Sequence, residues 1–297
     1  MTAHKPRLLR LVPAFALIYL IWGSTFLAIR FAVQTLPPLL MMGTRQLAAG
    51  LLLLAWLRAR GHKLPPARFW GPAFVAGAFL FLGCHGLLGW AELRVSSGLA
   101  ALLAATLPIW MVLLAHWKGQ DSHLSARVLC GIVMGIVGVG ILVPIDYTGA
   151  RMETLSALAI VVGEMLWAVG AIYARGVRTP GVPAVFASMQ MIAGGVLLLA
   201  VGLGMGEGSR VTAAAFTARA VVSLAFLIVF GSLVAFTVYT WMLQVCSAAA
   251  VSTHSYINPI VAVFLGWAAA GEHVGARTLA GTAIILGSVA LVSLRKR

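Results

Sequence analysis

Long, continuous apolar runs separated by short polar connections dominate the hydrophobic pattern of the chain. Ten of these runs approach or exceed the roughly 20 residues that an α-helix needs to cross a bilayer. They cover residues 9–28, 39–57, 69–88, 97–116, 128–143, 155–173, 183–204, 218–243, 249–270 and 276–294. A transmembrane β-barrel would alternate apolar and polar positions, and these runs do not alternate. The pattern therefore predicts an all-α integral membrane protein with ten transmembrane helices.

Composition agrees with lipid as the main solvent. The 297 residues are 61% hydrophobic and only 9% charged, which is more apolar than a soluble core of this size requires. The formal net charge of +14 would suggest nucleic acid in a soluble protein. Here the basic residues lie at the ends of apolar runs and form no basic, aromatic patch, so we expect the lipid bilayer and no nucleic acid as a partner. The first run follows a basic segment, as in a signal peptide, but it is long enough to span and we expect it to be retained.

The lysines and arginines also predict the orientation in the membrane. With both termini in the cytoplasm, 14 of the 21 basic residues fall in inner segments and six in outer segments. Cytoplasmic loops carry this kind of excess. We therefore predict a multi-pass protein with both termini cytoplasmic.

Two stretches of the chain resemble each other and indicate an internal duplication. S-S-G-L-A-A-L-L-A-A-T-L-P at residues 96–108 is matched by S-A-A-A-V-S-T-H-S-Y-I-N-P at residues 247–259, so that the first serine and the last proline recur 151 positions later. The same offset carries Trp90 to Trp241. A duplication explains several matches in order at a nearly constant offset better than chance does.

The duplication also predicts the architecture. Earlier in each half, an offset of 145 carries Trp22 to Trp167. Five spans per half is an odd number, so the second half must insert upside down relative to the first. We expect two inverted five-helix repeats, over residues 9–143 and 155–294, in one compact membrane domain. In such an architecture the substrate binds near the midplane between the repeats.

Several short motifs give the chain a resemblance to a known family. They are I-W-G-S-T-F at residues 21–26, Pro-Pro and then arginine within residues 37–45, R-G-H-K-L-P-P at 60–66, A-E-L-R-V-S-S-G-L-A-A at 91–101 and Y-I-N-P at 256–259. In combination they resemble the EamA-domain branch of the drug/metabolite transporter superfamily, as two tandem EamA repeats over essentially the whole chain. The resemblance implies ten transmembrane helices, a central pocket, and export or exchange of a small metabolite across a bacterial inner membrane. It also implies that the fifth and tenth helices often support a homodimer, and it leaves the substrate open.

Titratable residues inside the predicted spans are the first candidates for a substrate site. A charged carboxylate at the depth of Glu164 costs about 2.5–3.5 kcal/mol on insertion scales unless it is protonated or paired. Glu164 is either a proton-coupling or amine-recognising group, or a carboxyl hydrogen-bonded between helices. His85 and His254 either couple proton movement to transport, because imidazole titrates near neutrality, or bond a neighbouring helix.

A proline inside the ninth span creates a polar spot in an apolar helix. The ring of Pro259 leaves the carbonyl of Ser255 without its helical donor. His254 lies one turn before Asn258, and Tyr256 lies beside them. Freed backbone and these side chains together suit a substrate contact.

Two repeat-related pairs of tryptophans extend the candidate site. Tryptophans often collect at the membrane interface, which is an alternative for Trp90 and Trp241 near helix ends, whereas Trp22 and Trp167 lie further inside. We predict substrate contacts from both pairs. The complete set of predicted substrate-binding residues is Trp22, His85, Trp90, Glu164, Trp167, Trp241, His254, Tyr256 and Asn258.

Two further charged residues lie near span ends. Glu92 either lines the outer mouth of the pocket or pairs with Arg94. Arg45 matches the arginine of the family motif, and we favour a structural role for it, by snorkelling to the outer interface or by pairing that fixes helices.

Small residues along the fifth span indicate close packing. Gly131, Gly135 and Gly138 place a G-x-x-x-G stripe on one helix face. We expect this stripe to pack against another helix, within the chain or between subunits, without any chemistry.

Other functional classes lack their motifs in this sequence. An integral-membrane enzyme would need a nucleophile with a base, clustered acids or paired cysteines; no G-x-S-x-G, H-E-x-x-H or P-loop occurs, and we interpret Cys84, Cys130 and Cys246 as small buried hydrophobes. A channel would need rings of like polar groups. Both remain alternatives to our prediction of a secondary transporter that exports a small amphipathic metabolite, such as an amino acid or amine, by proton-coupled or facilitated alternating access. We expect no cofactor and no metal.

Overall fold

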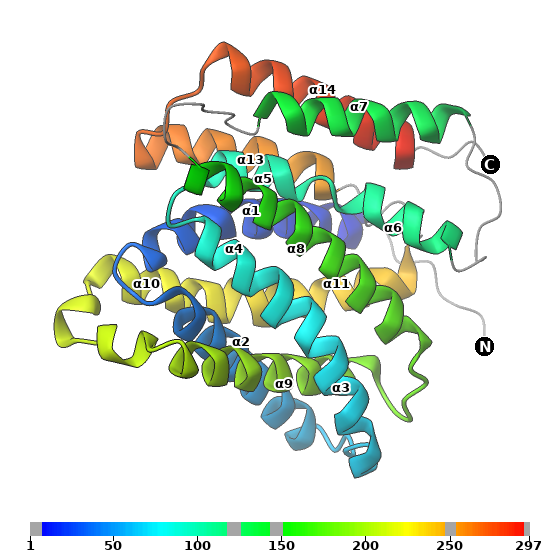
Figure 1. The fold of residues 1–297 in the computed structure, drawn as a ribbon. Coiled ribbons are helices and arrows are strands. Elements are labelled where there is room, and N and C mark those ends of the chain that lie inside the picture. Colours follow the sequence, from blue (N-terminus) through cyan, green and yellow to red (C-terminus); the bar gives the residue numbers. More distant parts are fainter. Residues whose placement is uncertain (1–7, 118–125, 143–150, 247–253, 294–297) are drawn as a thin grey trace.

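The computed structural model describes residues 8–117, 126–142, 151–246 and 254–293. Within these ranges every regular element is helical (Figure 1). The α-helices are α1 (Leu8–Val33), α2 (Pro38–Ala59), α3 (Trp70–Gly77), α4 (Gly86–Ala91), α5 (Ser97–Ala104), α6 (Leu107–Trp117), α7 (Ala126–Leu142), α8 (Arg151–Gly176), α9 (Pro183–Gly204), α10 (Ala218–Phe226), α11 (Ala235–Val245), α13 (His254–Ala270) and α14 (Ala276–Ser293). Two π-helical segments, η2 (Ala78–His85) and η5 (Leu227–Val234), join α3 to α4 and α10 to α11.

Seven of the ten predicted spans are long and apolar enough to cross a membrane. These are Leu11–Val33, Pro38–Ala59, Ala67–Ala91, Ser97–Leu114, Met152–Gly176, Pro183–Gly204 and Ala218–Tyr239. Shorter apolar helices, Ala126–Leu142, Ile257–Ala270 and Ala276–Leu291, lie at the predicted fifth, ninth and tenth spans. The all-helical membrane class is therefore confirmed, while the predicted beginning of the ninth span lies outside the described residues.

The predicted fourth span is divided into two helices. α5 ends at Ala104 and α6 begins at Leu107. Pro108 lacks a backbone N–H and its ring crowds the preceding turn, which disfavours a continuous α-helix here. The hydroxyl of Thr106 donates to the Leu103 carbonyl at 2.7 Å and stabilises the break.

Helices α2 and α9, one from each half of the chain, pack face to face through glycines. Gly43 lies against Leu199, and Gly50 lies against Ile192, so the two helices run antiparallel. A Cβ added to Gly195 would lie 2.5 Å from the backbone nitrogen of Leu47. The absence of side chains at these positions is what allows the two backbones to approach so closely.

The glycine stripe of α7 packs within the chain, against α14. The Ser288 hydroxyl donates to the Gly131 carbonyl at 2.7 Å. A Cβ on Gly138 would lie 2.7 Å from Ile285, and Gly281 lies against Leu142. Residue numbers rise along α7 as they fall along α14, so this pair is also antiparallel.

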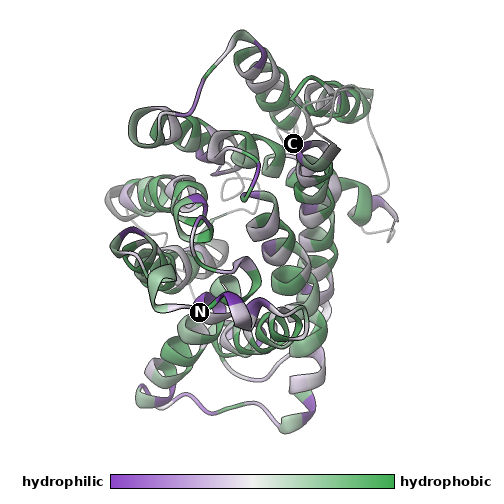
Figure 2. Cartoon of the chain, turned by 60° about the vertical axis from the view of Figure 1, so that its left-hand side comes forward, coloured by the Kyte–Doolittle hydropathy of each residue, from purple (hydrophilic) through white to green (hydrophobic). Residues whose placement is uncertain are grey.

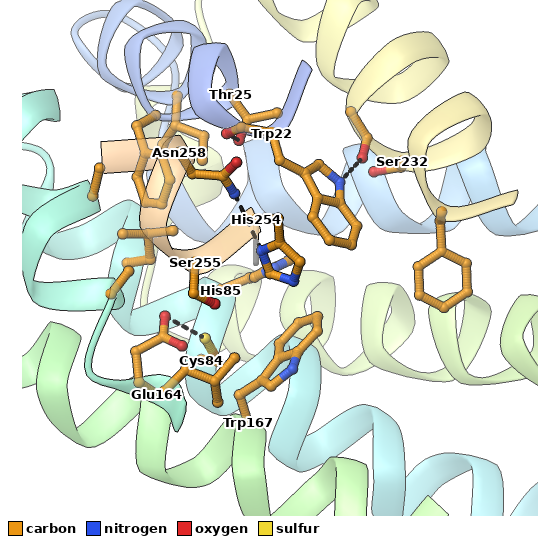
Figure 3. Close-up of a pocket in the computed structure, with 18 of the residues that line it drawn as sticks. Trp22, Thr25, Cys84, His85, Glu164, Trp167, Ser232, His254, Ser255 and Asn258 are labelled. Carbon is orange, nitrogen blue, oxygen red and sulfur yellow. Dashed lines mark hydrogen bonds between the residues drawn. The ribbon is translucent and has the colours of Figure 1, made fainter. Parts of the chain in front are cut away.

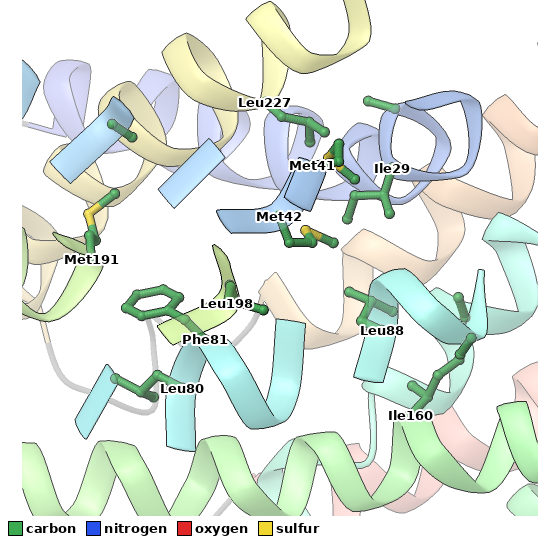
Figure 4. Packing of buried hydrophobic residues seen from close by; sticks show 14 of the residues in the cluster. Ile29, Met41, Met42, Leu80, Phe81, Leu88, Ile160, Met191, Leu198 and Leu227 are labelled. Atoms are coloured by element: carbon green, nitrogen blue, oxygen red, sulfur yellow. The ribbon is translucent and has the colours of Figure 1, made fainter. Parts of the chain in front are cut away.

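Hydrophobic residues cover both the core and the outside of the bundle. Ile29, Met42, Leu102, Met189 and Leu198 are among the largest fully buried or nearly buried side chains, and Figure 4 shows part of this cluster. The outer faces of the helices are also largely apolar, and hydrophilic residues gather towards the connections (Figure 2). Apolar side chains on both sides of a helix are expected where lipid replaces water.

At one end of the bundle, acidic residues of the second half cap helices of the first half. The carboxylate of Glu272 accepts hydrogen bonds from the Ser97 nitrogen and hydroxyl, both at 2.8 Å, and from the Gly98 nitrogen at 3.0 Å. Glu207 accepts from the Leu40 nitrogen at 2.9 Å. Carboxylates at helix N-termini satisfy free N–H groups and complement the helix dipole. Since α5 and α2 begin at the same end, these carboxylates hold the two halves together there.

Replacing Glu272 by glutamine is expected to destabilise the protein by about 1–2 kcal/mol, because hydrogen bonds to charged groups are each worth more than neutral ones. The amide nitrogen of glutamine cannot accept from the Gly98 nitrogen. In a chain of this size the apparent melting temperature should fall by roughly 2–8 °C. Thermal unfolding of the purified variant measures this, with Glu153→Gln as the control because Glu153 is exposed on α8. Equal melting temperatures for wild type and Glu272→Gln would contradict the capping role.

Candidate functional site

A cavity of about 170 Å³ lies between the two halves of the chain. It is somewhat larger than the engineered cavity of about 150 Å³ that holds one benzene molecule in another protein. Its walls come from α1, α2, η2, α4, α5, α6, α8, α9, η5, α11 and α13, and Figure 3 shows part of its lining. The predicted site residues among its lining are Trp22, His85, Glu164, Trp167, His254 and Asn258. Six residues from four separate stretches of the sequence therefore line one cavity.

Each inner tryptophan pairs with a histidine of the other half. Trp22 meets the edge of His254, with ring centroids 4.9 Å apart and an interplanar angle of 81°. Trp167 stacks on His85 at 5.3 Å and 28°. Phe81 lies against both of these last two rings. The cavity thus has flat aromatic walls contributed by both halves, which suits the apolar part of a small molecule.

Two amides position the histidines and leave acceptors free. Nε2 of Gln46 lies 2.6 Å from Nδ1 of His85, and Nδ2 of Asn258 lies 3.4 Å from Nδ1 of His254. Since an amide N–H only donates, Nδ1 accepts in each pair. The other amide atoms, Oε1 of Gln46 and Oδ1 of Asn258, are buried without a hydrogen-bond partner. A buried acceptor without a donor is costly, and a bound ligand with N–H groups would satisfy these two.

Glu164 places a carboxyl group in the same cavity. It is only 8% exposed, and among the described residues it accepts a hydrogen bond from the Cys84 thiol at 3.7 Å. A thiol is a weak donor, and none of the basic residues described here forms an ion pair with this carboxyl. A cation or a proton would therefore be stabilised beside Glu164.

A π-helical segment shapes the opposite wall. The indole N–H of Trp22 donates to the carbonyl of Gly231 in η5 at 3.1 Å. A π-helix shifts the backbone hydrogen-bond register, and such segments are frequent at functional sites. A Cβ on Gly231 would lie 2.9 Å from the Thr25 methyl group, so glycine allows α1 to approach this segment.

Two other predicted site residues lie away from the cavity. Trp90 packs against the main core on one side, and the guanidinium of Arg94 lies 5.0 Å from its ring centroid. Trp241 packs on a small cluster with Ile18 and Met242. Neither lines the cavity, because their helical positions turn them to other faces. Substrate contact by either residue stays a prediction, and the Tyr256 side chain is outside the described residues.

Several lining residues were missed by the sequence-based prediction. The buried Arg45 lines the cavity, so it does not snorkel to an interface. Gln46 and Ser232 are uncharged polar residues in apolar runs, which carry little signal on their own. Of the cysteines expected to be buried, Cys84 is buried in the cavity wall, but Cys130 is exposed on α7 and Cys246 is half-buried. Within the described ranges no three His, Cys, Asp or Glu residues are grouped to hold a metal ion.

Glu92 lies just beyond the third span and does not pair with Arg94. It is completely buried, and neither carboxylate oxygen has a hydrogen-bond partner. Arg30 donates instead to the backbone carbonyls of Glu92 and Val95. Burial raises the pKa of Glu92 well above its ordinary value; Glu272 also raises it, while Arg30 and Arg45 act in the opposite direction.

Glu92→Gln is expected to change how stability depends on pH. Because the pKa of folded Glu92 lies above its ordinary value of 4.5, the folded protein holds this proton more tightly than the unfolded chain. Proton binding by Glu92 therefore stabilises the folded protein fully below about pH 4.5, and this stabilisation is lost as the pH rises through the raised pKa of folded Glu92. The melting temperature of Glu92→Gln should therefore rise relative to that of wild type as the pH increases from about 5 to about 9. Parallel profiles for the two proteins would contradict a buried, proton-binding Glu92.

Comparison with known families decides the class of the protein. The model of the EamA-like transporter family matches residues 10–143 and again residues 154–294. The chain belongs to the EamA-like transporter family. Together the two matches cover nearly the whole sequence, so the cavity described above belongs to a multi-pass membrane transporter.

Individual relatives agree with this family. The uncharacterized inner membrane transporter YedA of Escherichia coli (strain K12) is 34% identical, over 98% of this chain and 92% of its own length. Protein PagO of Salmonella typhimurium is 27% identical over 84% of this chain and 82% of its own length. A crystal structure of a protein 19% identical in sequence aligns with a TM-score of 0.68, over 95% of this chain and 96% of the other. The last comparison supports the fold of this EamA-like transporter.

Proposed function

We propose that this EamA-like transporter exports a small amphipathic amine or amino acid across a bacterial inner membrane by alternating access. The observation that carries the proposal is the aromatic cavity between the halves, with an unpaired carboxyl at Glu164 and two free amide acceptors. An ammonium group carries N–H donors and a positive charge. It could therefore donate to the two amide oxygens and neutralise the carboxylate of Glu164. The aromatic walls then contact the apolar part of the molecule.

The packing of equivalent helices supports two inverted repeats over residues 9–143 and 155–294. In that proposal α2 and α9 are equivalent second helices, and α7 and α14 are equivalent fifth helices. Both pairs run antiparallel, as inversion of one half requires. Rocking of one repeat against the other around a fixed cavity is a common mechanism of secondary transporters.

We propose that the outer end of the cavity is the closed end in this state. Glu207 and Glu272 tie the halves together at the end where α2 and α5 begin. The cavity lining instead reaches Tyr239 and His254, near the end where α11 finishes and α13 begins. If both termini are cytoplasmic, as the basic residues predict, the tied end faces outward and substrate would load from inside.

Proton coupling would use the titratable groups of the cavity. A carboxyl at Glu164 can hold either a proton or the substrate ammonium, but not both at once. Competition for this carboxyl would exchange a proton for the substrate between the inward-open and outward-open states of the transporter. His85 and His254 lie on the same walls and are the further candidates for proton transfer.

Transport by purified protein in proteoliposomes tests the proposal. Amino acids and small amines are screened for uptake and efflux, with and without an imposed pH gradient. We expect saturable movement of at least one amine, accelerated by a pH gradient, and loss of that acceleration in Glu164→Gln. Glu153→Gln is the matched control on the same helix. No movement of any amine or amino acid would reject the substrate class, and an unchanged pH response in Glu164→Gln would reject the coupling role.

A further inference from the structure

The carboxyl group of Glu92 lies at the closed end of the bundle, where α2 and α5 begin, without a polar contact of its own. Glu92 follows α4, in the connection to α5, and is 0% exposed. Both carboxyl oxygens are buried without a hydrogen-bond partner. A buried carboxylate without donors loses its hydration and gains nothing in return, whereas a protonated carboxyl carries no charge. The closed state therefore favours a proton on Glu92.

The charged groups around Glu92 do not replace this proton. Arg30 of α1 donates to the backbone carbonyls of Glu92 and Val95 and not to the carboxyl group. Arg45 of α2 and Glu272 of the second half act on Glu92 only electrostatically, and in opposite directions. Burial outweighs these charges and raises the pKa of Glu92.

The other titratable groups on neighbouring elements face elsewhere. Arg94, on the same connection, is exposed, and so is His273, on the connection between α13 and α14. Helix α8 also packs against α4, but its Glu153 is exposed and its Glu164 lines the cavity. Among the described residues of the closed end, Glu92 alone combines burial with a carboxyl group that has no hydrogen-bond partner.

Separation of the two halves at this end would bring water to Glu92. The carboxylate of Glu272 accepts from the nitrogens of Ser97 and Gly98, at the start of the helix that follows the Glu92 connection. A Cβ on Gly98 would lie 3.1 Å from the Val263 side chain, so α5 and α13 are in close contact here. Moving α13 and Glu272 away from α5 would open this connection to solvent, which stabilises the ionised carboxylate.

We propose that Glu92 is a proton-binding site that holds the outer end of the transporter closed, and that its proton leaves to water when this end opens. This inference rests on the alternating access of the proposed function and adds a control by pH to it. The proton enters and leaves on the same side, so it is separate from any proton or substrate at Glu164. Acid on that side favours the closed state. Since one proton is involved, the ratio of open to closed protein rises by up to about tenfold per pH unit.

Distances across the closed end, measured by pulsed electron paramagnetic resonance on full-length protein in lipid nanodiscs, test the proposal. Spin labels are attached through Arg94→Cys and His273→Cys, two exposed positions in different halves, after the three native cysteines are replaced by alanine. Loss of His273 also removes an imidazole that titrates near neutrality. With Glu92 present, a short distance should dominate at about pH 5, and the ratio of long to short distances should rise at least about tenfold by about pH 9.

Substitutions at position 92 assign the response to this carboxyl group. Glu92→Gln is neutral at every pH, so it should keep the short distance throughout. Glu92→Asp retains a titratable carboxyl and should retain the response, and Glu153→Gln, which removes an exposed acid, should behave as wild type. If Glu92→Gln does not fold, Glu92→Met supplies an uncharged side chain of similar length and should show the same loss of response.

Two results would overturn the proton site. One is a pH response that persists in Glu92→Gln, because another group would then control the opening. The other is a single, unchanged distance distribution in wild type from about pH 5 to about pH 9. Neither result depends on a substrate. Opening that responds to pH, combined with no movement of any amine in proteoliposomes, would keep the proton site and reject the substrate class of the proposed function.

Discussion

Valine in place of Gly195 is expected to lower the stability of the protein by about 3 kcal/mol or more. The first added atom, Cβ, would lie 2.5 Å from the Leu47 nitrogen and 2.9 Å from its Cα. Both are backbone atoms, so no side-chain rotation relieves the contact and α2 must move away from α9. This movement would loosen the packing along a helix pair that links the two halves.

Thermal unfolding of the purified variant measures this effect. A loss of this size corresponds to a melting temperature lower by roughly 6–12 °C. Gly204→Val is the matched control on the same helix, because a Cβ there has no neighbour within 4 Å. If Gly195→Val unfolds at the same temperature as Gly204→Val, the close approach of α2 and α9 is wrong.

Trp167→Ala is expected to reduce the transport rate at low substrate concentration about tenfold. The indole stacks on His85 at 5.3 Å and forms part of the aromatic wall. Aromatic pairs contribute about 0.5–1.5 kcal/mol beyond their buried area, and about 1.4 kcal/mol corresponds to a factor of ten. Trp167→Phe retains a ring at this position, so it should keep most of the activity.

Initial rates in proteoliposomes measure the effect of Trp167→Ala, normalised to the amount of folded protein. Trp267→Ala is the control, because Trp267 is 59% exposed on the outside of α13. Wild-type rates in Trp167→Ala, or an equal loss in Trp267→Ala, would argue against a specific aromatic wall at His85.

The helical architecture was predictable from hydrophobicity, but its interruptions were not. The length of an apolar run reports how much lipid a segment can cross, and this predicted the seven long apolar helices among the described residues. The π-helical segments η2 and η5 differ from α-helix in hydrogen-bond register, which leaves no mark on an apolar sequence. The break before Pro108 was visible as a proline, yet a proline alone does not say whether a helix kinks or divides.

Single residues of the site were predictable where burial is costly. Glu164, His85 and His254 were found because polar groups are rare within apolar runs. The sequence relation between Trp90 and Trp241 predicted equivalent positions, but it carries no information on which way the two rings face. Pairing of Glu92 with Arg94 failed because the turn after α4 buries Glu92, whereas Arg94 is exposed and lies over the Trp90 ring.

The position of Arg45 in the cavity wall could not be predicted from the sequence. A lone arginine near a span end is usually explained by snorkelling, so its sequence position favoured a structural role. Only the fold places it beside η5 and within the cavity wall. Whether Arg45 snorkels or lines the cavity depends on the helix face that it occupies and on its neighbours from the other half of the chain. One of these neighbours, Ser232, lies 187 positions away in the sequence.

An experimental structure with the transported compound bound tests most directly whether this cavity is the substrate site. The compound should lie between Trp22 and Trp167, with its amine at Glu164. In Glu164→Gln, determined under the same conditions, the compound should be absent or displaced. A compound bound outside the cavity, or bound identically in wild type and Glu164→Gln, would contradict the account.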